Sequence, residues 1–144
     1  RRGGRLMGSR CPDGGCTVLV VDDEYDLVQT LRDVFTDEGF NVRTVSNGRD
    51  ALIYLREAAV KPCLVILDLI LPILDGNAVY AIMKADPELA SVPILVSTSD
   101  PSRAPAGAEV MRKPISLESL LTHVEHYCFR REELPRRSPS GEGS

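Results

Sequence analysis

The chain has 144 residues, 43% hydrophobic and 26% charged, which fits one globular domain with a core large enough to fold alone. This length leaves no room for a second full domain, and a formal net charge of -4 at pH 7 argues against a nucleic-acid-binding face. The apolar stretch at residues 60–74 is interrupted by charged residues and prolines, so it is not the ~18-residue span that a membrane helix needs, and we expect a soluble protein.

The two ends of the sequence differ in composition from the middle. Residues 1–15 are rich in Gly and Arg, and residues 130–144 are rich in Arg, Glu, Pro, Ser and Gly. We therefore expect a flexible leader, one folded domain over residues 16–129 and a disordered tail. The leader lacks the continuous apolar segment of a secretory signal. This absence predicts a cytoplasmic protein, in which we expect reduced thiols at Cys11 and Cys16; the short loop between this pair could also close a disulfide or hold half of a metal site.

Short apolar runs alternate with helix-period segments along the middle of the chain. The first run, residues 17–21, is rich in β-branched residues and predicts a buried strand, which ends at Asp22-Asp23-Glu24. Apolar residues at three- and four-residue steps then predict a helix that stops at Gly39. The same alternation predicts further strands at residues 42–45, 63–67, 93–97 and 109–111, and further helices that begin near residues 48, 76 and 116.

Polar side chains follow the predicted strands at the points where these end. Apolar strands joined by helices form a parallel sheet covered on both faces, and such sheets bind ligands at the carboxyl ends of their strands. We expect one small cleft there. The side chains expected to line it are Asp22 and Asp23 after the first strand, Asp68 after the third, Thr98 after the fourth and Lys113 after the fifth.

This set of side chains predicts a magnesium site with a reactive carboxylate. Carboxylates about 4 Å apart repel each other by roughly 4 kcal/mol at an effective dielectric constant near ~20, so three of them need added positive charge. Mg²⁺ prefers carboxylate oxygens and often bridges them to a phosphoryl oxygen, and Lys113 adds a second cation. Asp68 can then attack phosphorus to give an acyl phosphate, while Thr98 donates a hydrogen bond to the transferred group.

Four segments, in chain order, resemble the response-regulator receiver family. Residues 20–24 (Val-Val-Asp-Asp-Glu) resemble its acidic-pair segment, and residues 67–76 resemble its phosphoacceptor segment, with a Pro four residues after the Asp and an Asp-Gly that opens the next helix. Residues 93–98 resemble its hydroxyl-bearing strand, and residues 112–114 its lysine-proline step. The resemblance covers about Cys16 to Tyr127. It implies a flavodoxin-like, doubly wound α/β fold with a five-stranded parallel sheet in the order 2-1-3-4-5.

The resemblance also implies a function. It implies a bacterial two-component or phosphorelay module that takes a phosphoryl group from a sensor histidine kinase or a histidine phosphotransfer protein and needs Mg²⁺. Such a module catalyses only its own phosphoryl transfer and autodephosphorylation, acts on an unidentified downstream protein, and contacts neither nucleic acid nor membrane directly; homodimerisation is left open. The implied roles are phosphoacceptor for Asp68, metal ligands for Asp22, Asp23, Asp68 and the Ile70 backbone carbonyl, switch hydroxyl for Thr98, phosphate-binding cation for Lys113, and a cis bond before Pro114.

The sequence departs from the family pattern after Thr98. Residues 100–107 contain two prolines and no apolar helical stripe, so we expect the fourth helix to be shortened or missing. Val110 stands where the family usually has an aromatic switch residue, which leaves no ring to follow a movement of Thr98. Ile70 is apolar where a side chain that orders water could stand, and this predicts slow loss of the phosphoryl group.

Two other functions stay open at this point. A degenerate receiver would bind partners without being phosphorylated, which the short segment after Thr98 and the presence of Val110 both favour. An aspartyl-phosphate phosphatase on a similar scaffold would need an Asp-x-Asp after the first strand, where this chain has Asp22-Asp23-Glu24. The acids at that position also suit a plain helix N-terminus. Labelling by a phosphodonor, or turnover of a phosphomonoester, would separate these functions.

Overall fold

The computed structural model describes the backbone of residues 16–137 and the side chains of residues 16–127. The expected leader, residues 1–15, and residues 138–144 of the expected tail lie outside the described residues. None of the helices that the structure describes combines the length and the apolar character needed to cross a membrane.

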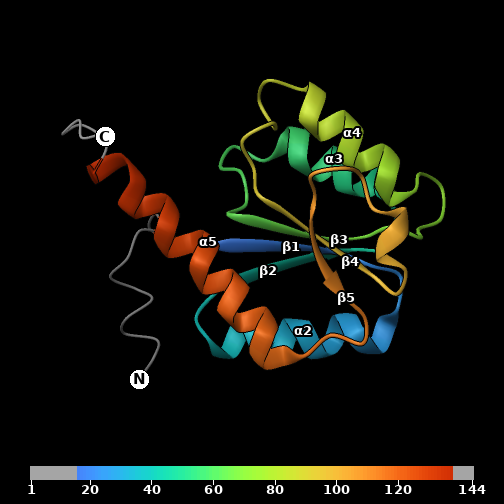
Figure 1. The fold of residues 1–144 in the computed structure, drawn as a ribbon, viewed down its shortest axis with the longest axis horizontal. Coiled ribbons are helices and arrows are strands. Elements are labelled where there is room, and N and C mark those ends of the chain that lie inside the picture. The colour runs from blue at the N-terminus through green and yellow to red at the C-terminus, as the bar shows by residue number, and fades with distance from the viewer. Residues whose placement is uncertain (1–15, 138–144) are drawn as a thin grey trace.

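Five parallel strands form one sheet in the order β2-β1-β3-β4-β5, as the resemblance implied. Each short apolar run of the sequence became a strand within a residue or two of its expected bounds. β3 and β4 are buried along their whole length because helices cover both faces of the sheet (Figure 1). The strands are β1 (Thr17–Val21), β2 (Asn41–Val45), β3 (Leu64–Asp68), β4 (Ile94–Thr98) and β5 (Glu109–Arg112).

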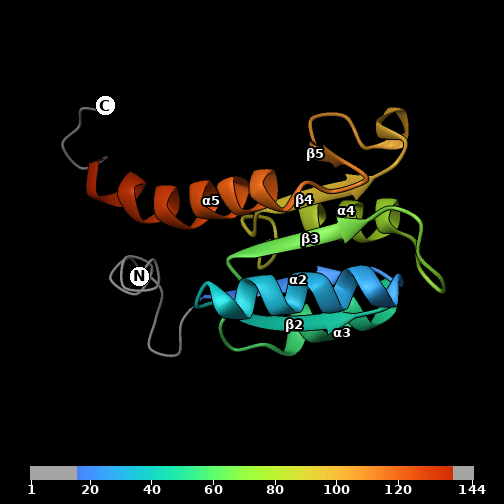
Figure 2. The same cartoon turned by 90° about the horizontal axis from the view of Figure 1, so that it is seen from below.

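Four α-helices cover the sheet, two on each face (Figures 1 and 2). The α2 and α5 side chains pack on one face against residues such as Val20 and Ile66, and the α3 and α4 side chains pack on the other against residues such as Val21 and Leu67. Alternate residues of each strand therefore enter separate cores. The helices are α2 (Tyr25–Asp37), α3 (Gly48–Glu57), α4 (Gly76–Ala85) and α5 (Leu117–Arg137).

The fourth helix of the predicted pattern is missing. Between β4 and β5 the described chain has only a 3-10 turn, η1 (Pro101–Arg103). Its start is capped by Asp100, whose Oδ1 accepts hydrogen bonds from the backbone N–H of Ser102 at 3.2 Å and from its hydroxyl at 2.6 Å. The two prolines and the absence of an apolar stripe explain why no longer helix forms. The shortened segment was correctly predicted.

Two expectations about the ends of the domain need correction. Helix α5 continues to Arg137, whereas a tail without structure was expected from residue 130. The composition there argues against burial, but Arg and Glu are good helix formers, so a polar segment can extend a helix that is already nucleated. Cys16 is disulfide-bonded rather than reduced.

Candidate functional site

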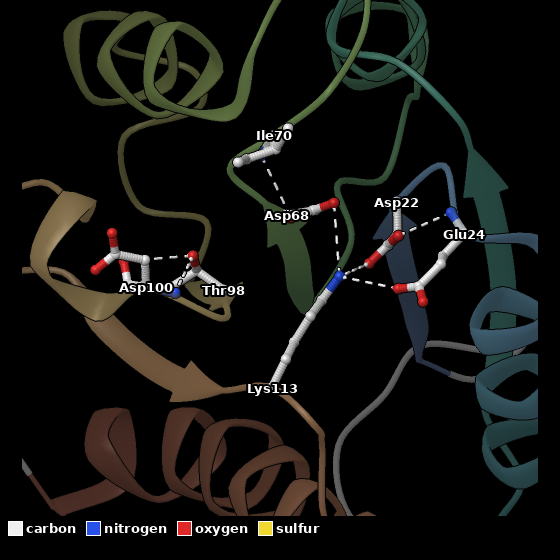
Figure 3. A network of polar contacts seen from close by, with 7 residues as sticks. All are labelled: Asp22, Glu24, Asp68, Ile70, Thr98, Asp100 and Lys113. Atoms are coloured by element: carbon white, nitrogen blue, oxygen red, sulfur yellow. Dashed lines mark hydrogen bonds and ion pairs between the residues drawn. The ribbon is translucent and has the colours of Figure 1, made fainter.

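The predicted site residues meet at the carboxyl ends of β1, β3, β4 and β5 (Figure 3). The strand register explains why. Val21 pairs with Leu67, so Asp22 and Asp68, each one residue further along, lie side by side on the same face of the sheet. Thr98 pairs with Arg112, so Lys113 comes one residue later, level with the end of β4.

The end of β3 is held in place by the start of α4. The backbone N–H of Gly76 donates a hydrogen bond to the carbonyl of Leu69 at 2.8 Å. A Cβ atom at position 76 would collide with the backbone carbonyl oxygen of Asp68. Asp75 caps α4 by accepting a hydrogen bond from the N–H of Ala78 at 3.0 Å. The Asp-Gly step of the sequence therefore lets a helix begin directly against the backbone of Asp68.

Three carboxylates form a compact cluster. One oxygen from each of Asp22, Asp23 and Asp68 lies within 4.8 Å of the others. Asp22 and Asp68 are buried, with exposed fractions of 4% and 7%, while Asp23 is exposed. The two buried acids come from neighbouring strand ends, and Asp23 opens the cluster toward solvent. This arrangement confirms that the acids predicted to gather at one edge of the sheet do so.

Lys113 reaches into this cluster from the end of β5. Its Nζ lies 3.0 Å from Asp22 Oδ2, 3.3 Å from Glu24 Oε1 and 3.6 Å from Asp68 Oδ2. Burial alone would lower the pKa of Lys113, but the hydrogen bond and charge of Asp22, together with the charge of Asp68 and the hydrogen bond of Glu24, raise it. Lys113 is therefore a fixed cation at neutral pH.

The pKa of Asp68 is raised from 3.8 to about 6. Burial is the main cause, and the negative charge of Asp22 adds to it, with a smaller contribution from Asp23. The Lys113 ammonium and a hydrogen bond at 3.3 Å from the Ile70 N–H act in the opposite direction. One lysine thus does not compensate the three acids. A second cation bound between them would, and carboxylate oxygens at this spacing suit a hard divalent ion such as Mg²⁺.

Thr98 lies at the site with its hydroxyl bonded away from the acids. The side chain is buried, with an exposed fraction of 3%. Its Oγ1 accepts a hydrogen bond from the Asp100 N–H at 3.1 Å and donates one to the Asp100 carbonyl at 3.4 Å (Figure 3). The hydroxyl is therefore held by the turn that replaces the fourth helix, and its O–H must leave the Asp100 carbonyl to donate to a group on Asp68.

Ile70 and Glu24 complete the surroundings of Asp68 and Lys113. The Ile70 side chain is 60% exposed beside Asp68, and the predicted role of its carbonyl as a metal ligand stays a prediction. The Lys113–Pro114 peptide bond is cis, as the resemblance implied. Glu24 was missed as a site residue, although it directly follows the acidic pair in the sequence.

Comparison with known proteins identifies the family. A model of the response regulator receiver domain matches residues 18–125. The chain belongs to this family. Its matches among curated proteins include the DNA-binding response regulator MtrA of Mycolicibacterium smegmatis, which is 33% identical over 125 residues, 82% of this chain and 53% of that protein. The receiver therefore spans about half the length of the curated relatives that it matches.

Solved structures share the receiver fold. A putative response regulator from Chloroflexus aurantiacus is 28% identical with a TM-score of 0.72, and the match covers 78% of this chain and 97% of that one. The receiver domain of sensor histidine kinase PA1611 from Pseudomonas aeruginosa is 21% identical with a TM-score of 0.71, over 79% of this chain and 98% of that one. That protein has a magnesium ion coordinated in its active site cleft.

Proposed function

We propose that this receiver is a phosphoacceptor signalling module in which Asp68 takes a phosphoryl group from a sensor histidine kinase or a histidine phosphotransfer protein. The observation that carries the proposal is the position of the Asp68 carboxylate. It lies 3.6 Å from the Lys113 ammonium and within 4.8 Å of two further carboxylates, at the end of a buried strand. Membership of the receiver family supports the same function.

The donor set fits a resident Mg²⁺ ion held by Asp22, Asp23 and Asp68, with the Ile70 carbonyl as a further ligand. Burial raises the pKa of Asp68 most, and the charges of Asp22 and Asp23 add to this effect, so a cation bound among the three carboxylates would offset it. When bound, Mg²⁺ supplies positive charge to the carboxylates and to a phosphoryl oxygen.

The residues of this chain then perform the transfer. An oxygen of Asp68 attacks phosphorus, so a P–O bond forms to the carboxylate as the P–N bond to the donor histidine breaks. Lys113, fixed 3.6 Å from Asp68, neutralises charge on an equatorial oxygen of the transferred group. The Thr98 hydroxyl donates a hydrogen bond to another oxygen once it leaves the Asp100 carbonyl.

A mass measurement tests this function. The full chain is incubated with Mg²⁺ and acetyl phosphate, and intact mass should show one added phosphoryl group. Asp68→Asn should show none, and exposed Asp33→Asn on α2 should label as the wild type does. Labelling of the Asp68→Asn variant to the wild-type level would place the acceptor elsewhere and refute the assignment.

A degenerate receiver is the second function to test. Two observations favour it: Val110 carries no aromatic ring, and the Thr98 hydroxyl is held by Asp100 in the turn that replaces the fourth helix. No labelling by acetyl phosphate or by a histidine phosphodonor would support this function. Turnover of a phosphomonoester would instead support a phosphatase.

The proposed setting is the cytoplasm, with proteins as partners. Relatives such as MtrA are named as DNA-binding response regulators, but this chain spans only about half of their length. We propose that the receiver itself binds neither nucleic acid nor membrane, in keeping with its net charge of -4. Its output then passes through a downstream protein, and analytical ultracentrifugation with and without phosphodonor would show whether it forms a homodimer.

A further inference from the structure

Glu24 has an unusual position for the residue that begins a helix. It is the N-cap residue of α2, yet its side chain makes no capping hydrogen bond to that helix. Its Oε1 instead accepts a hydrogen bond at 3.3 Å from Nζ of Lys113, 89 residues away in the sequence. The short side chains of Ser, Thr, Asp and Asn usually accept from the backbone N–H groups of the first turn, and the longer Glu24 side chain takes a different partner. The position of this one is explained by Lys113.

The Lys113 ammonium has three N–H donors and three carboxylates around it. Asp22 lies at 3.0 Å, Glu24 at 3.3 Å and Asp68 at 3.6 Å. In Figure 3 the Asp68 carboxylate lies above Nζ, and the Asp22 and Glu24 carboxylates lie to the right of it. The backbone of Glu24 is itself fixed, because its N–H donates to Asp22 Oδ1 at 2.9 Å. Asp22, Glu24 and Lys113 thus form a closed ring of contacts.

Two of these three partners also belong to the proposed metal site. Asp22 and Asp68 lie with Asp23 in the carboxylate cluster, and among the described residues that cluster does not include Glu24. Carboxylate oxygens that coordinate a hard cation are less available to a lysine. Lys113 has a long, flexible stem, so it needs a fixed acceptor to stay in one place. When a metal ion occupies Asp22 and Asp68, Glu24 is the carboxylate that still accepts a hydrogen bond from Lys113.

We propose that Glu24 is a positioning residue that keeps the Lys113 ammonium beside Asp68 while the other acids are engaged by metal, without being a metal ligand itself. The inference rests on the proposed function of Asp68 as phosphoacceptor. The Glu24 side chain is 63% exposed, so water and salt weaken its ion pair with Lys113. Its removal should therefore change rates by about 2- to 5-fold rather than abolish phosphorylation.

The first test needs no phosphodonor. Lys113 is labelled with an amine-acetylating reagent in wild type, Glu24→Gln and Asp26→Asn, and the rate is followed by peptide mass spectrometry. Asp26 lies in the first turn of α2 and is not a partner of Lys113, so its variant controls for the lost charge. With saturating Mg²⁺ we expect Lys113 of Glu24→Gln to react about 2- to 5-fold faster than in the other two proteins.

The dependence on metal separates positioning from a general loosening of α2. Without Mg²⁺ the hydrogen bond from Lys113 to Asp22 persists, so the difference between Glu24→Gln and wild type should shrink. Equal labelling of all three proteins in Mg²⁺ would overturn the proposal. So would a faster rate for Glu24→Gln that is the same with and without the ion.

The second test measures phosphorylation by acetyl phosphate as Mg²⁺ is varied. We expect Glu24→Gln to lower the maximal rate about 2- to 5-fold and to leave the half-saturating Mg²⁺ concentration within about 2-fold of wild type. Asp23→Asn should instead raise the Mg²⁺ requirement. Faster phosphorylation of Glu24→Gln, or a raised Mg²⁺ requirement like that of Asp23→Asn, contradicts the inference. If wild type itself takes no phosphoryl group, the proposed function fails, while the labelling test still decides the role of Glu24.

Discussion

Replacing Asp68 with Asn removes a buried carboxylate whose pKa the fold raises, and we expect the variant to be more stable than wild type at pH 7. The pKa of Asp68 is about 6 in the folded protein, against 3.8 for an unperturbed Asp. The folded state therefore binds a proton more tightly than the unfolded state does, and the wild type loses stability as the pH rises from about 4 to about 6. Above about pH 6 Asp68 is ionised in both states, so the full loss of unfolding free energy persists.

The size of the effect follows from the same two pKa values. Each pKa unit corresponds to about 1.4 kcal/mol, so the ionised Asp68 costs about 3 kcal/mol of unfolding free energy at pH 7. The attraction of Lys113 is already included, because it is one of the causes that set the pKa. Asn has the shape of Asp and no charge, so Asp68→Asn should recover most of this amount at pH 7 and little of it below pH ~4.

Urea unfolding in EDTA, followed by circular dichroism between pH 4 and 8, measures the difference. The midpoint of Asp68→Asn should move above that of wild type as the pH rises, with an unchanged slope. Asp33→Asn on the exposed surface of α2 is the matched control and should follow the wild type at every pH. An Asp68→Asn variant that is no more stable than wild type at pH 7, or a gain that is equally large at pH 4, would refute the electrostatic reasoning.

Three further predictions concern the same strand ends. Mg²⁺ at ten times its dissociation constant should stabilise the wild type by about 1.4 kcal/mol at pH 7.5, and a thermal-shift titration should show this gain shrinking below pH ~6 as Asp68 takes up a proton. Ile70→Asn should shorten the half-life of the phosphorylated protein by bringing in a water-ordering amide, whereas a lengthened half-life in a phosphate-release assay would contradict this. Gly76→Ala should lower the free energy of unfolding by about 1–3 kcal/mol, measured by urea unfolding, because its methyl group would collide with the Asp68 carbonyl. An unchanged midpoint would show that the backbone at the start of α4 shifts to accept the methyl group.

The sequence predicted the parts of this structure that depend on local pattern. The short apolar run at residues 64–68 between turn residues favours a strand buried on both faces, and the prolines in residues 100–107, with no apolar stripe, argue against a full α-helix there. The convergence of Asp22, Asp68 and Lys113 followed from the rule that parallel strands present their carboxyl ends at one edge. These predictions needed no knowledge of side-chain rotamers.

Other features depend on contacts that a local pattern does not encode. The Thr98 hydroxyl, whose predicted hydrogen bond to a phosphoryl group stays a prediction, is bonded to the backbone of Asp100 two residues later, and the sequence pattern does not specify this rotamer. The extension of α5 to Arg137 lies in a segment whose Arg and Glu residues favour a helix, whereas the composition rule that predicted a tail weighs only the lack of apolar residues to bury. The contact between Glu24 and Lys113 joins residues 89 positions apart, and an acid after two acids is equally well explained by the positive end of the helix dipole.

The raised pKa of Asp68 and the three contacts of Lys113 share one setting, a partly buried space with more acids than cations, in which burial is the larger cause of the raised pKa. The fold tolerates this excess because the surrounding strands and helices bury enough apolar surface to hold the acids together. A proton on Asp68 removes part of this negative charge at low pH, and in the proposed function a divalent cation offsets it at neutral pH. Because a cation held between these carboxylates would favour the ionised form of Asp68, protonation of Asp68 and the proposed metal binding should compete, and the proposed site should hold Mg²⁺ more tightly as the pH rises.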